Sequence, residues 1–105
     1  MIIAVDFDGT ISLGDLNEML PNHALITKLI KARSMGHKLI LWTCRGEEWL
    51  NEAIAFCQDY NLVFDAVNEN IKGYDYIKIS CKAVADLYVD DKSPGSIEYF
   101  MRMIG

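Results

Sequence analysis

Short apolar runs alternate along this chain with stretches in which apolar residues recur at helical spacing. The first run, Met1–Val5, contains no polar residue, which is typical of a strand buried on both faces and therefore central in a parallel sheet. Similar runs over residues 38–43, 62–67 and 87–89 predict three further strands. Residues 68–80 show no clear pattern beyond a loop with one helical turn.

Helical patterns separate these runs. Asn22 is a good N-cap for a first helix that Gly36 ends. A second helix is predicted to start at Glu47, and a closing helix carries Pro94 in its first turn. Strands alternating with helices imply right-handed crossovers, so the sequence predicts a single α/β domain over residues 1–105, built on a doubly wound parallel sheet.

Composition and charge narrow the functional classes. With 105 residues, 51% of them hydrophobic, the chain can bury one core but not two. No apolar stretch approaches the ~20 residues of a membrane span and no signal-like segment opens the chain, so we expect a cytoplasmic protein without a membrane partner. The net charge of −5 argues against a nucleic-acid partner. The three cysteines form no CxxC pair, which supports neither a disulfide framework nor a zinc site.

Aspartates and a threonine lie at the ends of three of the predicted strands. Asp6 and Asp8 follow the first strand, Thr43 ends the second, and Asp90 and Asp91 follow the fourth. Parallel strands bring their carboxyl ends to one edge of a sheet, where ligands of α/β proteins bind. Four carboxylates converging there would repel one another without a cation, and Mg²⁺ prefers such oxygen ligands. The sequence therefore predicts a Mg²⁺ site at this edge.

In this arrangement the chain resembles the haloacid dehalogenase (HAD) superfamily of phosphatases and phosphotransferases that use an aspartate nucleophile. The run from Asp6 to Thr10 matches the DxDGT form of the first family motif, residues 39–43 match the apolar strand ending in Thr or Ser, and residues 88–91 match the apolar strand ending in paired acids. The resemblance implies a three-layer, Rossmann-like fold. The family's single motif lysine is best matched by Lys82, with Lys78 and Lys72 as alternatives.

The resemblance also implies a role for each matched residue. Asp6 would attack phosphorus, and Asp8 would serve as general acid and then as general base. The Asp6 carboxylate, the Asp8 backbone carbonyl and Asp90 would bind Mg²⁺, with Asp91 assisting directly or through water. The Thr43 hydroxyl and the Cys44 backbone N–H would hold the phosphoryl oxygens, and Lys82 would offset their charge. Gly9 would permit a tight turn, and Thr10 would be a structural hydrogen-bonding residue.

Some features leave alternatives open. About thirty residues separate Thr10 from Lys38, too few for the cap domain common in this superfamily, so the chain resembles a capless member. Its site would be open to bulky phosphorylated substrates unless a second subunit covered it in a homodimer. Arg45 could contact a substrate phosphate through its planar fork, or pair with Glu47 or Glu48.

Two other functional classes compete with a phosphatase. Response-regulator receivers also cluster Asp, Thr and Lys, but their acidic pair comes early and their acceptor aspartate ends a middle strand, whereas here the pair comes late and Asp65 has no neighbouring carboxylate. A non-catalytic Mg²⁺-binding or interaction domain would keep the fold without the reaction. Phosphate transfer to another acceptor would use the same residues as hydrolysis.

Overall fold

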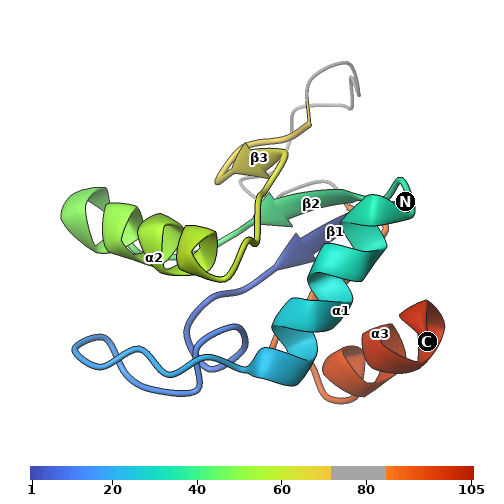
Figure 1. The fold of residues 1–105 in the computed structure, drawn as a ribbon, viewed down its shortest axis with the longest axis horizontal. Helices are drawn as coiled ribbons and strands as arrows, with labels where there is room; N and C mark the ends of the chain where they lie inside the picture. The colour runs from blue at the N-terminus through green and yellow to red at the C-terminus, as the bar shows by residue number, and fades with distance from the viewer. Residues whose placement is uncertain (72–84) are drawn as a thin grey trace.

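A computed structural model describes residues 1–71 and 85–105 of the protein. Its sheet has four parallel strands in the order β3-β2-β1-β4. The strands are β1 (Ile2–Val5), β2 (Lys38–Leu41), β3 (Ala66–Val67) and β4 (Leu87–Val89). The four predicted strands are thus confirmed, and β1 lies between β2 and β4 as its apolar sequence indicated (Figure 1).

Two strands are shorter than predicted, for identifiable reasons. β2 ends at Leu41 because the Thr43 N–H donates to the side chain of Asn68 (2.8 Å) instead of to a strand. Residues 62–65 are not part of β3, because the Leu62 N–H donates to the Cys57 carbonyl at the end of a helix (2.9 Å). Leu62 is nevertheless buried, so its apolar character serves the core rather than a strand.

In the described part of the chain three helices connect or follow the strands: α1 (His23–Ser34), α2 (Glu47–Asp59) and α3 (Ser96–Ile104). Asn22 caps α1 by accepting the Leu25 N–H (3.3 Å), and Gly36 follows the helix with φ +98°, both as predicted. The prediction for Pro94 was wrong, since α3 is capped by Gly95 and Pro94 precedes the cap. The described residues contain no helix long and apolar enough to cross a membrane.

The core lies between one face of the sheet and the three helices. Ile3 and Val5 of β1 share a buried cluster with residues of β2, β4 and all three helices. Alternate strand residues face the other way, where Ile2, Ala4 and Ile40 form a smaller cluster. Within residues 1–71 and 85–105 no helix packs on this second face, so the described chain shows two of the three layers that the sequence predicted.

The cysteine and tryptophan side chains of the described residues differ in burial. Cys57 is fully buried, and burial raises the pKa of its thiol to about 12, as befits an inert core residue. Cys44 is exposed. Trp49 is 43% exposed, and Trp42 is only partly buried. Trp49 lies in the first turn of α2, one turn before Ala53 on the same helix face, and the full burial of Ala53 and Cys57 does not extend back to this turn.

Two aspartates at the opposite edge of the sheet have structural roles. The Asp86 carboxylate accepts the Ile2 N–H (2.7 Å), and that of Asp65 accepts the Leu39 N–H (2.8 Å) at the start of the neighbouring strand. Asp65 also pairs with Arg33 (3.2 Å). Because Asp65 precedes β3 rather than ending a middle strand, it does not occupy the place of a receiver's phosphate acceptor.

The direction of strand order reverses at β1. The chain proceeds from β1 outwards to β2 and β3, and then β4 returns to the other side of β1. Ligands of open α/β sheets bind beyond the carboxyl ends of the strands at such a reversal point. The residues that follow β1 and β4 therefore occupy the favoured position for a site.

Candidate active site

Asp6, Asp90 and Asp91 lie together at this reversal point. Asp6 directly follows β1, and its N–H donates to the Val89 carbonyl at the end of β4 (3.0 Å). This bond extends the pairing of the two strands by one residue, and Asp90 and Asp91 follow immediately. Carboxylate oxygens of the three aspartates all lie within 4.8 Å of one another. The convergence predicted from the sequence is confirmed for these three side chains.

The group fits a Mg²⁺ ion. All its ligand atoms are carboxylate oxygens, and they lie within 4.8 Å of one another, a range that includes the ~3 to ~4 Å between two ligands of one octahedral Mg²⁺. Asp6 and Asp90 are partly buried and Asp91 is exposed, so the site keeps an open side for water and substrate oxygens. Among the described residues, Asp6, Asp90 and Asp91 are therefore the side chains placed to hold the ion.

Repulsion and burial perturb the acidity of this group. Burial raises the pKa of Asp6 to about 6, and the negative charges of Asp90 and Asp91 add to the effect. The pKa of Asp91 is lowered, chiefly through hydrogen bonding to the Asp90 side chain. A divalent cation would compensate the same repulsion, and this gives the cluster a physical reason to bind one.

Thr10 and Gly9 hold the two sides of the cluster together. Thr10 is fully buried, its hydroxyl accepts the Asp91 N–H (3.0 Å), and it lies 3.3 Å from an Asp6 carboxylate oxygen. This agrees with its predicted structural role. Gly9 has φ +82°, and a Cβ at this position would overlap the carboxylate of Asp91. The DxDGT motif thus serves the site through its small residues as well as its acids.

Asp8 is turned away from the other acids and is paired with Arg45. The guanidinium donates from Nε (2.9 Å) and Nη2 (2.8 Å) to both carboxylate oxygens, and Nη1 donates to the Trp49 carbonyl (3.1 Å). The Arg45 side chain is 2% exposed, lies over the Phe7 ring, and has its pKa raised chiefly by the hydrogen bond to Asp8. In this structure Arg45 pairs with Asp8 and not with Glu47 or Glu48, which corrects the expected local pair, while its contact with a substrate phosphate stays a prediction.

The separation of Asp8 from the cluster also bears on its predicted metal role. The sequence resemblance assigned the metal the backbone carbonyl of Asp8, not its carboxylate, and the carboxylate indeed lies outside the group formed by Asp6, Asp90 and Asp91. Asp8 therefore remains available for proton transfer. Each of its oxygens accepts one bond from Arg45 and keeps a second lone pair that can carry a proton to a substrate.

Thr43 and Cys44 lie beyond the carboxyl end of β2, on the same edge as the aspartates. The Thr43 hydroxyl accepts the Arg45 N–H (3.2 Å), and Asn68 anchors the Thr43 backbone. The roles of these two residues as phosphate ligands stay predictions. Lys82, Lys78 and Lys72 lie outside the described residues, as does Cys81.

Sequence reasoning missed two residues that position the site. Asn68, which the sequence placed in a solvated loop, has φ +51° and orients the backbone at Thr43. Ser96 accepts the Asp90 N–H (3.1 Å) and donates to the Asp90 carbonyl (2.9 Å), which fixes the backbone beside the cluster. The sequence signal for such positioning residues is a polar side chain just after a strand or in the first turn of the next helix. Many polar side chains at these positions contact only solvent, so the signal alone does not identify them.

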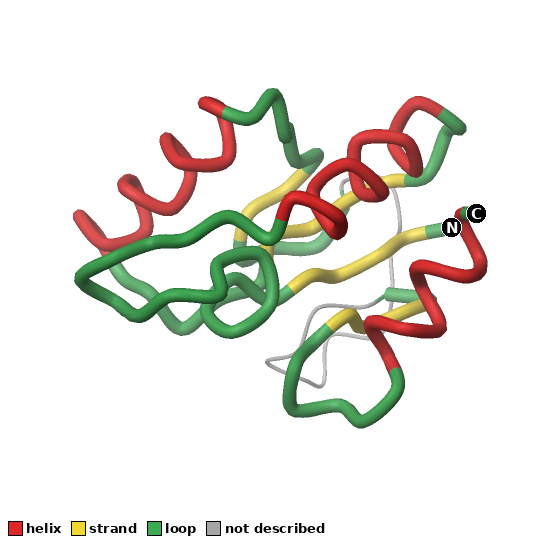
Figure 2. Tube along the Cα trace, turned by 60° about the horizontal axis from the view of Figure 1, so that its bottom comes forward, coloured by secondary structure: helices red, strands yellow, loops and turns green. Residues whose placement is uncertain are grey.

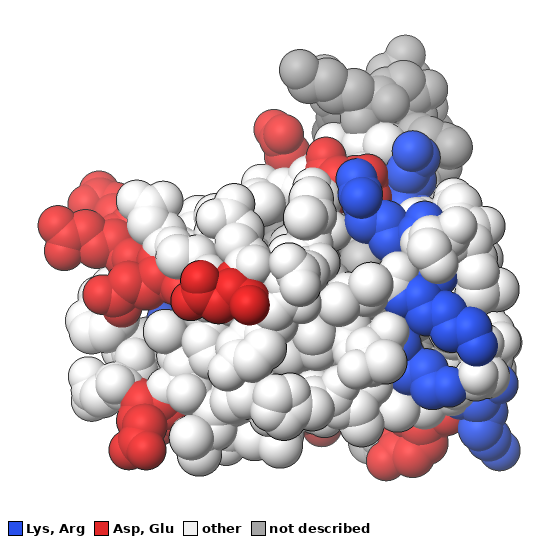
Figure 3. All heavy atoms as spheres, in the orientation of Figure 1, with Lys and Arg blue, Asp and Glu red and all other residues white. Residues whose placement is uncertain are grey.

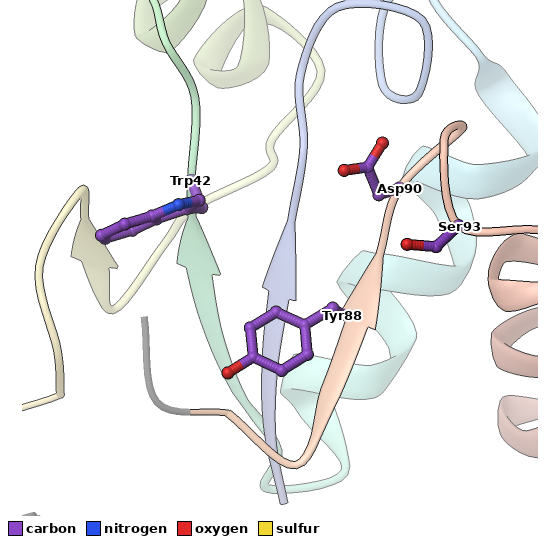
Figure 4. Close-up of a pocket in the computed structure, with 4 residues that line it drawn as sticks. All are labelled: Trp42, Tyr88, Asp90 and Ser93. Carbon is purple, nitrogen blue, oxygen red and sulfur yellow. The ribbon is translucent and has the colours of Figure 1, made fainter. Parts of the chain in front are cut away.

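One hollow lies beside the carboxylate cluster and another lies beside Asp8. The first, of about 410 Å³, is lined by Trp42, Tyr88, Asp90 and Ser93, and Figure 4 shows Asp90 and Ser93 across from Trp42 and above Tyr88. The other, of about 280 Å³, is lined by Asp8 and Arg45 together with residues from the 11–20 loop and the start of α2. The proton-transfer residue and the carboxylate cluster thus each have a space beside them.

Comparison with solved structures identifies proteins that are similar to this chain. A conserved protein from Bacteroides thetaiotaomicron is 34% identical to this chain, with a TM-score of 0.83 over 99% of this chain and 88% of that one. This chain belongs to the family of that protein. A target protein from Vibrio cholerae matches 99% of this chain and 98% of its own with a TM-score of 0.52 and 16% identity, which supports the fold alone. No protein-family model and no curated protein matches.

Replacement of Gly9 by Ala should weaken metal binding. The new Cβ would displace the Asp91 carboxylate and would also hold a non-glycine residue at positive φ. Because the exposed Asp91 side chain can rotate away, we expect a folded protein whose Mg²⁺ affinity, measured by titration calorimetry, falls about tenfold, the cost of one weakened ligand.

Gly36→Ala is the matched control. Gly36 has φ +98°, and a Cβ added there would meet no atom within 4 Å. This variant therefore has the same unfavourable positive φ at a non-glycine residue but leaves the site unchanged. Both variants should lose similar stability, and only Gly9→Ala should lose affinity. Equal Mg²⁺ affinity in the two would contradict the placement of Asp91 in the site.

Because the pKa of Asp6 is raised, we expect the free energy of unfolding of the metal-free protein to fall as the pH rises. The unfolded chain loses this proton near its ordinary pKa of 3.8 and the folded chain near 6, so stability falls as pH rises between these values. Asp6→Asn should therefore be more stable than wild type in EDTA at pH 8, by about 1 kcal/mol after allowing for solvent screening, and the gain should shrink by pH 4.5. Urea unfolding at both pH values checks this; a gain independent of pH would contradict it.

Proposed function

We propose that this protein is a Mg²⁺-dependent phosphatase of the HAD type that acts through an aspartyl-phosphate on Asp6. The observation that carries the proposal is the separation of the acids into two groups. Asp6, Asp90 and Asp91 gather at the reversal point of the sheet, while Asp8, two residues from Asp6, is held apart by Arg45. A carboxylate nucleophile beside a cation and a second acid free for proton transfer are what this reaction needs.

The residues would divide the reaction into two displacements. An Asp6 oxygen attacks phosphorus while the bond from phosphorus to the alcohol oxygen breaks, and Asp8 donates a proton to that oxygen. Asp8 then accepts a proton from a water molecule that attacks the phosphorus of the aspartyl-phosphate, which releases inorganic phosphate and restores Asp6. Bound Mg²⁺ supplies the positive charge that lets a carboxylate approach an anionic phosphate.

The surrounding residues would hold these groups in place. Thr10 fixes the spacing of the Asp6 and Asp91 sides of the cluster, and Ser96 fixes Asp90. Thr43 and the Cys44 N–H are the proposed phosphoryl ligands, and Lys82 is the proposed charge-balancing lysine, with Lys78 and Lys72 as alternatives. The interval between Thr10 and Lys38 leaves no room for an inserted cap, since a loop and α1 fill it.

The test is hydrolysis of 4-nitrophenyl phosphate by the purified protein, with Mg²⁺ and with EDTA. We expect turnover that rises with Mg²⁺ and vanishes in EDTA, because a cation must offset the charges of both reactants. Mg²⁺ binding without any turnover would instead favour a non-catalytic domain. Turnover unaffected by EDTA would contradict the proposed site.

A further inference from the structure

The hollow beside Asp8 has the position of a leaving-group site. It measures about 280 Å³ and is lined by Asp8, Leu16, Cys44, Arg45, Gly46 and Trp49. A residue that protonates a leaving oxygen must lie within hydrogen-bond reach of it, so the alcohol part of a substrate has to sit beside Asp8. Pockets that enclose whole drug-sized ligands hold about 300–1,000 Å³, so this hollow suits part of a small ester.

Two large apolar side chains line this hollow beside the Asp8–Arg45 pair. Leu16 is 44% and Trp49 43% exposed, so both offer apolar surface to a ligand. They come from different parts of the chain, the loop over residues 11–20 and the first turn of α2, which Figures 1 and 2 both show on the same side of the molecule. An indole face gives a flat ring a stacking surface.

The loop that carries Leu16 is held in shape by its own hydrogen bonds. The Ser12 hydroxyl accepts the Gly14 N–H (3.3 Å) and the Leu20 N–H (3.1 Å), and Ser12 is fully buried. The Asp15 carboxylate accepts two further backbone N–H groups near the tip, from Asn17 and Glu18. Leu16 is therefore presented at the tip of an ordered loop.

The charge around this hollow is negative. Figure 3 shows acidic side chains gathered at the end of the molecule that carries α2 and the loop, and most visible Lys and Arg side chains over the other end. The acids of the loop and of the first two turns of α2 are Asp15, Glu18, Glu47, Glu48 and Glu52. The cation in the wall, Arg45, is already paired with Asp8. An additional negative charge on the substrate would meet repulsion here, whereas a positive charge would be attracted.

We infer that the hollow between the 11–20 loop and α2 binds the alcohol part of the substrate and selects phosphate monoesters of aromatic alcohols that are neutral or positively charged. This inference rests on the proposed phosphatase function and adds the substrate class. Trp49 supplies the stacking surface, Leu16 closes the opposite wall, and the acidic rim sets the preferred charge.

Three esters with leaving groups of similar acidity isolate the effect of charge: the phosphates of tyramine, 4-methylphenol and 4-hydroxyphenylacetate. For wild type we expect kcat/KM to fall about tenfold from the cationic to the anionic ester, with the gap narrowing at high salt. Glu48→Gln should narrow the gap as well. Equal kcat/KM for the three esters would overturn the charge preference.

Side-chain variants test the stacking surface. Trp49→Ala should lower kcat/KM about tenfold for all three esters, and Leu16→Ala should lower it less. Tyr99→Ala, which removes an exposed aromatic ring on α3, and Leu20→Ala, in the same loop but outside the hollow, are the matched controls and should change nothing. An active enzyme indifferent to Trp49→Ala would overturn the inference and leave the phosphatase function standing.

Binding of the free alcohol gives a readout that does not depend on activity. The two indole N–H signals in an NMR spectrum can be assigned with Trp49→Phe, and tyramine should shift the Trp49 signal more than 4-hydroxyphenylacetate does. No shift with either compound would overturn the assignment of the hollow. If instead the signal shifts and no ester is hydrolysed, the phosphatase function fails, and the inferred substrate class fails with it.

Discussion

Asp6→Asn should lower kcat for aryl phosphate hydrolysis by at least about a thousandfold while leaving the protein folded. The substitution removes the proposed nucleophile, and an amide cannot form the acyl phosphate on which the two-step reaction depends. The backbone bond from residue 6 to Val89 is kept, and Asn can still accept the hydroxyl of Thr10. Loss of activity would therefore report chemistry rather than collapse of the fold.

Asp59→Asn provides the comparison, because Asp59 is an exposed aspartate at the end of α2, away from the cluster. It should retain wild-type kcat within about twofold, as surface substitutions usually change little. Steady-state assays at saturating Mg²⁺ measure both variants. Retention of activity in Asp6→Asn would remove Asp6 from the role of nucleophile and sink the mechanism.

Asp8→Asn should destabilise the protein as well as inactivate it. Arg45 is 2% exposed and its guanidinium depends on the Asp8 carboxylate for two charge-assisted bonds. Removing one partner leaves a buried charge without compensation, which we expect to lower the free energy of unfolding by about 3 kcal/mol. Urea unfolding measures the change.

A double variant separates the effect of the Asp8–Arg45 ion pair on stability from the role of Asp8 as general acid. In Asp8→Asn/Arg45→Met the buried charge is absent and the Met side chain can still pack on Phe7, so stability should return to within about 1 kcal/mol of wild type. Activity should stay low, because the proton donor is still missing. If Asp8→Asn is as stable as wild type, the ion pair does not stabilise the fold, and the claim that Arg45 holds Asp8 in place is wrong.

Much of the fold was predictable because the signals were local. The apolar run of β1 indicated a central strand, and Asn22 and Gly36 mark the two ends of α1 through chemistry that depends only on neighbouring residues. The convergence of Asp6 with Asp90 and Asp91 followed from parallel strands ending at a common edge. These predictions needed topology but no side-chain detail.

The features of the site that the sequence did not predict depend on contacts between segments far apart in sequence. The pairing of Arg45 with Asp8 joins residues 37 positions apart, and the orientation of Thr43 by Asn68 joins residues 25 apart. Local spacing favoured Glu47 or Glu48 as partners of Arg45, because residues close in sequence are the only candidates that a pattern can suggest. Trp49 has the same four-residue spacing as the buried Ala53 and Cys57, so its exposure depends on how far along α2 the tertiary packing extends.

The most direct test of the central claim is to find the phosphoryl group on Asp6. Asp8→Asn, kept below its unfolding temperature, should react with 4-nitrophenyl phosphate and Mg²⁺, because 4-nitrophenolate leaves without a proton, and then stall for lack of a base to activate water. Acid quenching and peptide mass analysis should show one phosphoryl group on the peptide containing Asp6, absent from Asp6→Asn. A phosphoryl group on another residue, or none despite turnover by wild type, would contradict the account.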